Sequence, residues 1–150
     1  MVKEGHFKSM EIMKKIIVCL AVFLCSGMAI AQNSLTLEIA SVKKHGGKIH
    51  ISIFNNEKSF DERKTYYSIV ANPIAETVFV PIVLPTGEYV ISMYQDSNGN
   101  GELDTNILGI PKELFGFSNY NGKSAPGNFK KHKVIVNEST KKISLHLYKI

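Results

Sequence analysis

One short stretch of the sequence carries oxygen-bearing side chains at close spacing around two glycines. Asp96, Asn98 and Asn100 occupy alternate positions, and Asp104 follows four residues later. Calcium takes roughly 6 to 8 oxygen ligands at about 2.3 to 2.6 Å, and a tight loop can supply them from side chains spaced two residues apart. The spacing therefore predicts a calcium loop, unless the same residues only form a turn.

The match to a calcium loop extends over nine residues. In the pattern DxDxDGxxD the first, third and fifth side chains point inward, the sixth residue is glycine, the seventh offers its carbonyl, and the ninth binds directly or through water. Asp96, Asn98 and Asn100 fill the inward places, Glu102 is seventh and Asp104 is ninth. These five residues are the predicted metal ligands, and residues 96–104 are called the acidic loop below.

The loop departs from an EF-hand at the twelfth position, where a bidentate Glu is needed and the chain has Ile107. It instead resembles the nine-residue calcium loops of integrin α-subunits and thrombospondin-like proteins. Because two inward residues are Asn, we expect weak calcium binding, with a Kd of about 10⁻⁴ to 10⁻³ M. Magnesium is disfavoured by its strict octahedral geometry, and zinc by the lack of a nearby His or Cys in the sequence.

The alternative is a turn held by hydrogen bonds. Asn, Asp and Gly dominate turns because they tolerate left-handed backbone angles and bond to neighbouring amides. Two carboxylates without a basic partner, Asp96 and Asp104, favour the ion. Both interpretations remain open at this point.

The N-terminal residues predict export. Lys14 and Lys15 precede an apolar run over residues 16–24, and Ala29 and Ala31 provide small residues for signal-peptide cleavage between Ala31 and Gln32. We expect translation to start at Met13, so that residues 1–12 are an upstream extension. The run is shorter than the roughly 20 residues of a membrane anchor. The protein is therefore expected to be secreted or periplasmic, with no membrane insertion after cleavage.

Cleavage would change the composition of the chain. The full sequence has a net charge of +5, and removal of four Lys and two Glu leaves +3, with the remaining Lys residues scattered. Nucleic-acid binding, which requires a clustered basic face, is therefore not expected. Cys19 and Cys25 both lie in the signal, so residues 32–150 carry no disulfide and no Cys nucleophile. Their length fits a single domain.

Strand patterns recur along residues 32–150. Apolar residues alternate over residues 35–39 and 49–53, and the glycine-containing KKHGGK between them predicts a hairpin. Further strands are expected at residues 65–71, 76–84, 89–94, 132–136 and 143–148, the last two around an NESTKK turn. Pro81 places 76–84 at a sheet edge. About seven strands without a convincing helix predict an all-β sandwich of immunoglobulin-like or transthyretin-like architecture.

Two longer stretches carry resemblances. LPTGEYVISMYQD, residues 84–96, resembles a strand of transthyretin-like bacterial modules. Residues 94–119 together with APGNFKKHKVIV, residues 125–136, resemble the DUF2141 family of small secreted bacterial proteins. Gln95 stands where that family often has His, and Gly127-Asn128-Phe129 replaces a Pro-Ser-Phe step. The resemblance implies the fold and the compartment; the family has no assigned function.

Catalysis is not expected. Histidines 45, 50 and 146 fall at turn or outward strand positions, and Ser118 lacks the glycine that follows a nucleophile in a nucleophile elbow. Asp96 and Glu113 could form an acid/base pair only if the fold brought them together. A hydrolase is therefore the less favoured alternative.

Binding is the second possibility for the segment after the acidic loop, residues 108–119, called the arm below. An aromatic cleft could hold a carbohydrate or peptide at the cell envelope, with candidate residues Tyr94, Glu113, Phe115, Phe117 and Asn119. The favoured interpretation is that Phe115 and Phe117 anchor the arm to the sandwich, with Glu113 exposed and calcium fixing the arm's orientation. The partner is not identified by the sequence.

Overall fold

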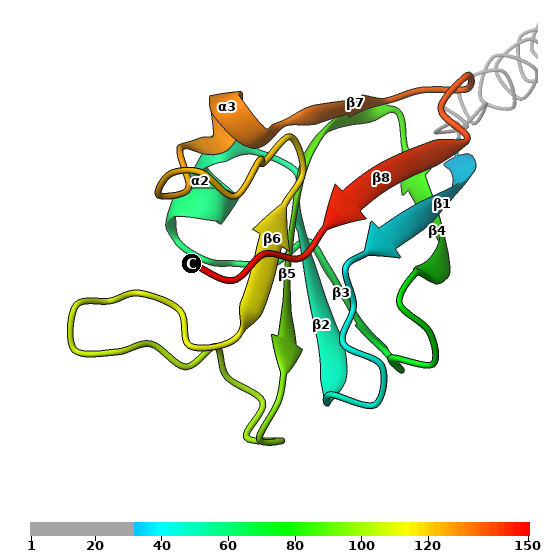
Figure 1. Ribbon diagram of the computed structural model, residues 1–150. Coiled ribbons are helices and arrows are strands. Elements are labelled where there is room, and N and C mark those ends of the chain that lie inside the picture. The colour runs from blue at the N-terminus through cyan, green and yellow to red at the C-terminus, as the bar shows by residue number, and fades with distance from the viewer. Residues whose placement is uncertain (1–31) are drawn as a thin grey trace, which may run out of the picture. The chain divides into compact units, whose positions relative to one another are not determined.

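Two β-sheets pack face to face in the computed structural model, which describes residues 32–150 (Figure 1). The all-β sandwich prediction is confirmed, with eight strands among these residues where about seven were expected. The predicted signal peptide and its cleavage position concern residues 1–31 and lie outside the described residues. None of the helices within residues 32–150 is long and apolar enough to cross a membrane.

The smaller sheet has the strand order β4-β1-β8. Strand β1 (Gln32–Ala40) lies between β4 (Val78–Pro85), to which it is antiparallel, and β8 (Lys142–His146), to which it is parallel. Pro81 lies in the middle of β4 and is exposed. Since proline has no N–H to donate to a neighbouring strand, this edge position agrees with the sequence prediction.

The larger sheet has the order β3-β2-β5-β6, and β7 also pairs with β5. Strand β6 pairs with the end of β5, and β7 pairs with its beginning. The strand bounds are Lys48–Phe54 for β2, Tyr67–Ala71 for β3, Gly87–Asp96 for β5, Leu114–Phe117 for β6 and Val134–Val136 for β7. Residues 97–113, which hold most of the acidic loop and the beginning of the arm, thus connect two neighbouring strands.

The space between the sheets is filled by alternate strand residues, because side chains in a strand point to opposite faces in turn. Leu37 and Ile39 of β1, Ile53 of β2 and Ile91 of β5 are completely buried there. A second cluster covers the other face of the larger sheet. It contains Phe54, Val90 and Phe129, with Phe60 and Phe117 packed against them, below helices α2 (Glu57–Asp61) and α3 (Phe129–His132).

The predicted hairpin of the first two strands is wrong. Strands β1 and β2 belong to different sheets, and residues 41–47 cross from one sheet to the other with Val42 buried in the core. The buried side chain of Gln95 holds this crossing: it accepts from the N–H of Lys43 at 2.9 Å and donates to the carbonyls of Lys43 and Gly47 at 2.7 and 3.0 Å. Alternation identified the strands but not their partners.

The last two strands, β7 and β8, also belong to different sheets. Strand β7 pairs with β5 and β8 pairs with β1, so the turn between them connects the two sheets. The side of the sandwich formed by β6 and β8 is closed, because Phe115 and Tyr148 exchange backbone hydrogen bonds of 3.0 and 2.8 Å. The arm is therefore fixed at its end to the C-terminal segment.

Candidate functional site

The acidic loop begins at the last residue of β5. Asp96 is only 3% exposed, and its two carboxylate oxygens accept from the N–H groups of Gly99 at 2.7 Å and Gly101 at 2.8 Å. Both glycines have left-handed backbone angles, with φ of 78° and 80°, which other residues adopt at a cost. The carboxylate of Asp96 therefore holds the turn together by its bonds to the backbone of both glycines.

The other end of the loop gathers three polar side chains. One carboxylate oxygen of Asp104, Oδ2, accepts from Nδ2 of Asn98 at 2.6 Å and from Nδ2 of Asn100 at 3.3 Å. The amide oxygens of the two asparagines accept from backbone N–H groups two residues further on, those of Asn100 and Glu102. The side chain of Glu102 itself is exposed.

The structure thus brings four of the predicted ligands, Asp96, Asn98, Asn100 and Asp104, into one loop bound together by hydrogen bonds. Within residues 32–150, no group of three or more His, Cys, Asp or Glu side chains surrounds a common metal position. The oxygens of Asp96 and of the asparagines bond to N–H groups of the loop. This geometry is that of the hydrogen-bonded turn considered as the alternative above.

Glu113 is the residue whose role the sequence did not show. It was expected to be exposed, but it is 4% exposed and lies under the loop. Its Oε1 accepts from the backbone N–H of Ser97 at 2.6 Å and from the Ser97 hydroxyl at 2.9 Å, and its Oε2 accepts from the N–H of Asp104 at 3.2 Å. One carboxylate of the arm therefore joins both ends of the acidic loop.

Several carboxylates act on the same region. Burial raises the pKa of the Tyr94 hydroxyl, and the negative charges of Asp96, Glu113 and Glu102 raise it further. That hydroxyl donates to the carbonyl of Gly101 at 2.6 Å. Three carboxylates therefore lie close enough to this hydroxyl to affect its ionisation.

One histidine does lie beside the loop, contrary to the argument from sequence spacing. Nε2 of His50 is 3.6 Å from Oδ2 of Asp96, and the His50 ring stacks on Tyr94 with ring centroids 4.9 Å apart. Burial alone would raise the pKa of Asp96, but the N–H groups of Gly101 and Gly99 and the charge of His50 outweigh it and hold this pKa below its usual value of 3.8. The charged form of the Asp96 carboxyl group is therefore favoured in the folded protein.

The aromatic residues of the arm point into the molecule. Phe115 is 2% exposed and Phe117 is half-buried, and both pack against Tyr120 with ring centroids about 6 Å apart. Asn119 has a left-handed φ of 52°, and its side chain donates to the carbonyl of Lys133 at 2.8 Å. Of the candidate ligand-binding residues, Tyr94 and Phe117 are partly exposed and Asn119 is exposed, while Glu113 and Phe115 are buried.

Ser118 and His132 form a buried connection between the arm and α3. The Ser118 hydroxyl donates to the His132 carbonyl at 2.6 Å, whereas the His132 ring bonds through Nδ1 to the Ser118 carbonyl at 3.0 Å and accepts from the N–H of Gly127 at Nε2, at 2.8 Å. Both residues are completely buried. The hydroxyl therefore does not face the imidazole, which a serine nucleophile would require.

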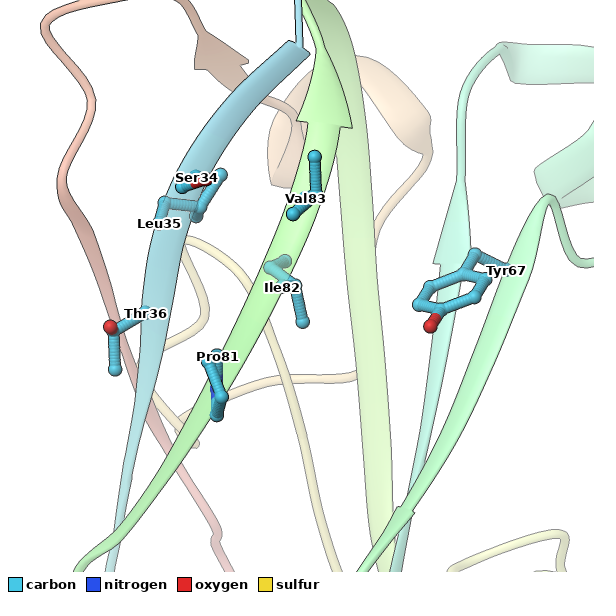
Figure 2. Close-up of a pocket in the computed structure, with 7 residues that line it drawn as sticks. All are labelled: Ser34, Leu35, Thr36, Tyr67, Pro81, Ile82 and Val83. Carbon is cyan, nitrogen blue, oxygen red and sulfur yellow. The ribbon is translucent and has the colours of Figure 1, made fainter.

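A groove of about 490 Å³ opens on the other side of the sandwich, between β3 and β4. Figure 2 shows the ring of Tyr67 directed toward Pro81 and Ile82 across this groove. The groove is lined by Ser34, Leu35, Thr36, Tyr67, Pro81, Ile82 and Val83. This lining contains no carboxylate and no histidine, so it offers no acid/base pair.

The family comparison agrees with the resemblance of the acidic loop and the arm. The model of the DUF2141 family, described as an uncharacterized protein conserved in bacteria, matches residues 37–144. The chain belongs to the DUF2141 family. No curated protein and no solved structure matches this DUF2141 chain. The family match covers every predicted site residue, the second hydrophobic cluster and most of the first.

Two buried carboxylates of this DUF2141 protein are bonded to the backbone of the acidic loop. Asp96 and Glu113 are both buried, and each carboxylate accepts hydrogen bonds from backbone N–H groups of the loop. Such bonds stabilise the charged form of a carboxylate and weaken it as a base. The acidic loop can offer side-chain oxygens to a cation, and Glu113 connects the loop to β6, which follows it directly.

Proposed function

We propose that this DUF2141 protein is a secreted or periplasmic, non-catalytic module of the bacterial cell envelope that binds a partner or supports a structure there. In this proposal the acidic loop binds calcium with low affinity, and the ion fixes the arm that follows. The observation that carries it is the meeting of Asp104 with Asn98 and Asn100 at one point, above the buried carboxylate of Asp96.

The ion would take the place of the two amide groups that now donate to Asp104. Each asparagine would turn its oxygen inward and give up the bond from the N–H two residues ahead. The carboxylate of Asp96 can keep its bonds to Gly99 and Gly101, because a carboxylate has about four lone-pair positions and two are used. Calcium tolerates such an irregular set of oxygens better than magnesium does.

Charge supports a cation at this place. Asp96, Glu102, Asp104 and Glu113 lie on or under the loop, and His50 is the basic side chain within 4 Å of a loop carboxylate in the described part of the chain. Like charges held together are costly. A divalent ion would relieve this repulsion and, through Glu113, tighten the link from the loop to the arm.

The buried aromatic side chains favour a supporting role for the arm over a sugar-binding platform. Phe115 of the arm is buried, and the large apolar side chains that the arm does expose, Leu108 and Ile110, are aliphatic. The hydrogen bonds that occupy Ser118, Asp96 and Glu113 favour a protein without catalytic activity. A carbohydrate or peptide ligand would have to bind by other residues.

The test is calorimetric titration and thermal melting of the protein from Gln32 to Ile150, which contains both hydrophobic clusters. We expect calcium to raise the melting temperature more than magnesium does, and Asp104→Asn to abolish the rise without unfolding the protein. Asp61→Asn, an exposed aspartate of α2, is the matched control and should keep the effect. Equal melting temperatures in calcium and in chelator, with no heat of binding, would sink the proposal.

A further inference from the structure

Residues 121–127 form an irregular stretch that leads from β6 toward α3 (Figure 1). This stretch, called the 121–127 segment below, contains no helix or strand, and most of its residues are exposed. Its backbone takes no part in either sheet. The hydrogen bonds that hold the segment on the protein therefore have to come from elsewhere.

Three hydrogen bonds involve the 121–127 segment within the described part of the chain. Two are local, within residues 120–124, at 2.6 and 3.1 Å. The third runs from the N–H of Gly127 to Nε2 of His132 in α3, at 2.8 Å. The hydrogen bond that joins the segment to α3 thus ends on a ring nitrogen that can bind a proton.

The His132 ring has the partners of a neutral imidazole. It is completely buried, it stacks on Phe117 with ring centroids 5.3 Å apart, and its Nδ1 lies 3.0 Å from the carbonyl oxygen of Ser118. Because Nε2 accepts from Gly127, the single proton of the neutral ring is on Nδ1, which donates to Ser118. Both ring nitrogens are satisfied in this form.

A second proton on the ring would remove the acceptor. Both nitrogens of a protonated imidazole are donors, so Nε2–H would face the N–H of Gly127 and the hydrogen bond would be lost. The positive charge would also be buried, which is costly unless a counter-charge is present. Water can solvate the protonated ring once the segment beside it has moved away.

The groups packed against the ring bring no negative charge. Strand β6 contributes Phe117 and is followed by Ser118. The Tyr120 ring packs edge-on with a centroid distance of 5.8 Å, and its hydroxyl stays neutral because burial raises its pKa. Burial lowers the pKa of the His132 ring below 6.5, and the positive charge of Lys131 lowers it further, although bonds to backbone groups oppose this.

Two carboxylates reach α3 from elements packed against it, and both bind lysines. Glu57 of α2 lies 3.7 Å from Nζ of Lys130, and Glu88 of β5 lies 2.7 Å from Nζ of Lys133. Neither carboxylate is among the groups that shift the pKa of His132. A proton on this ring would therefore lack a counter-charge.

We propose that the hydrogen bond from Gly127 to His132 is a pH-sensitive switch, which holds the 121–127 segment on α3 while the ring is neutral and releases the segment when the ring binds a proton. Release uncovers the His132 ring and leaves both sheets in place. No residue of the acidic loop takes part, so the switch does not depend on calcium binding.

Opening of the segment should take up one proton. An exposed ring in the open form binds its proton near pH 6.5, whereas the buried ring of the closed form does so only at lower pH. Between these two values the ratio of open to closed form should rise by up to about tenfold for each pH unit, because one proton is bound on opening. The segment is therefore closed above pH 6.5 and opens as the pH falls toward the pKa of the closed form.

Hydrogen exchange followed by NMR measures this opening at single residues. The protection factor, which corrects for the effect of pH on exchange itself, should fall at Gly127 by up to about tenfold per pH unit below pH 6.5. The fall should follow the titration of the His132 ring. Ile51 lies in the central strand β2 and is 1% exposed, so its amide reports global unfolding and should keep its protection.

A pair of histidine variants tests the acceptor. In His132→Gln the glutamine oxygen can accept from Gly127 in place of Nε2 but does not titrate in this range, so the protection of Gly127 should become independent of pH. His45→Asn is the matched control and should keep the pH dependence. His45 is exposed, and asparagine tolerates its left-handed φ of 58°.

A further measurement needs no variant. Nitrogen NMR of the imidazole should show the neutral ring with its proton on Nδ1 above pH 6.5. A neutral ring with its proton on Nε2 would have no acceptor for Gly127 and would overturn the proposal. This result decides the question even if His132→Gln fails to fold.

The exchange profile separates local opening from loss of the whole fold. Constant protection at Gly127 while the ring titrates would overturn the switch, as would a pH dependence that persists in His132→Gln. Equal loss of protection at Gly127 and Ile51 would show global unfolding and would also overturn it. Loss at Gly127 alone, absent in His132→Gln and retained in His45→Asn, would establish the switch whether or not the acidic loop binds calcium.

Discussion

Oε1 of Glu113 lies 2.6 Å from the backbone nitrogen of Ser97, so a residue of the arm closes the acidic loop at its first turn. The same oxygen accepts from the Ser97 hydroxyl, and the other oxygen accepts from the N–H of Asp104. Glu113 is buried, and within residues 32–150 no buried side-chain N or O atom lacks a hydrogen-bond partner. The loop and the arm are therefore one hydrogen-bonded unit.

Replacement of Glu113 by Gln should loosen this unit. The amide nitrogen would face an N–H donor in place of an acceptor oxygen, and a lost bond of this kind costs about 1–3 kcal/mol in unfolding free energy. Urea denaturation measures the change, and hydrogen exchange should show faster opening at Ser97 and Asp104. Glu102→Gln, at an exposed side chain, should leave the urea midpoint within error. Equal midpoints for the two variants would show that Glu113 does not close the loop.

Asp96 should make the protein sensitive to acid. Its pKa is held below 3.8 in the folded state, mainly by the N–H groups of Gly101 and Gly99, against the effect of burial. The unfolded state then binds the proton more readily, so this stabilisation is present above pH 3.8 and is lost as the pH falls through the folded pKa. In urea titrations at decreasing pH, Asp96→Asn should lose stability less steeply than the unchanged protein below that value. Parallel curves would contradict this role.

Local sequence patterns identified the loop but not what holds it. The Asn, Asp and Gly spacing located the turn, because those residues act on backbone amides within five positions. The support from Glu113 and the crossing held by Gln95 depend on pairs 16 and about 50 residues apart. No periodicity encodes such distances along the chain. Alternation of apolar residues likewise showed which side chains face the core, but not that β1 pairs with β4 and β8.

His132 should contribute a separate pH dependence at milder acidity. Burial and the charge of Lys131 lower its pKa below 6.5, although the bond to the Ser118 carbonyl opposes this. The neutral ring is favoured in the folded state, so the stabilisation is full above pH 6.5 and falls as the pH decreases toward the folded pKa. NMR titration should show the His132 ring gaining its proton only below pH 6.5. His132→Gln should flatten the stability curve in this window; a His132 ring that titrates at or above pH 6.5 would contradict the prediction.

Gly116 should tolerate no side chain, because it lies where β6 of the larger sheet meets the last residue of β8. A Cβ at this position would lie 2.2 Å from the carbonyl oxygen of His146 and 2.9 Å from the end of the Met93 side chain. Backbone cannot yield as a flexible side chain can, so Gly116→Ala should cost about 1–3 kcal/mol through overpacking. Gly127→Ala is the matched control, since the nearest atom to its Cβ would be Cδ of the flexible Lys131 side chain. If urea denaturation gave the two variants the same midpoint, the β6 and β8 edges would not be held in close contact.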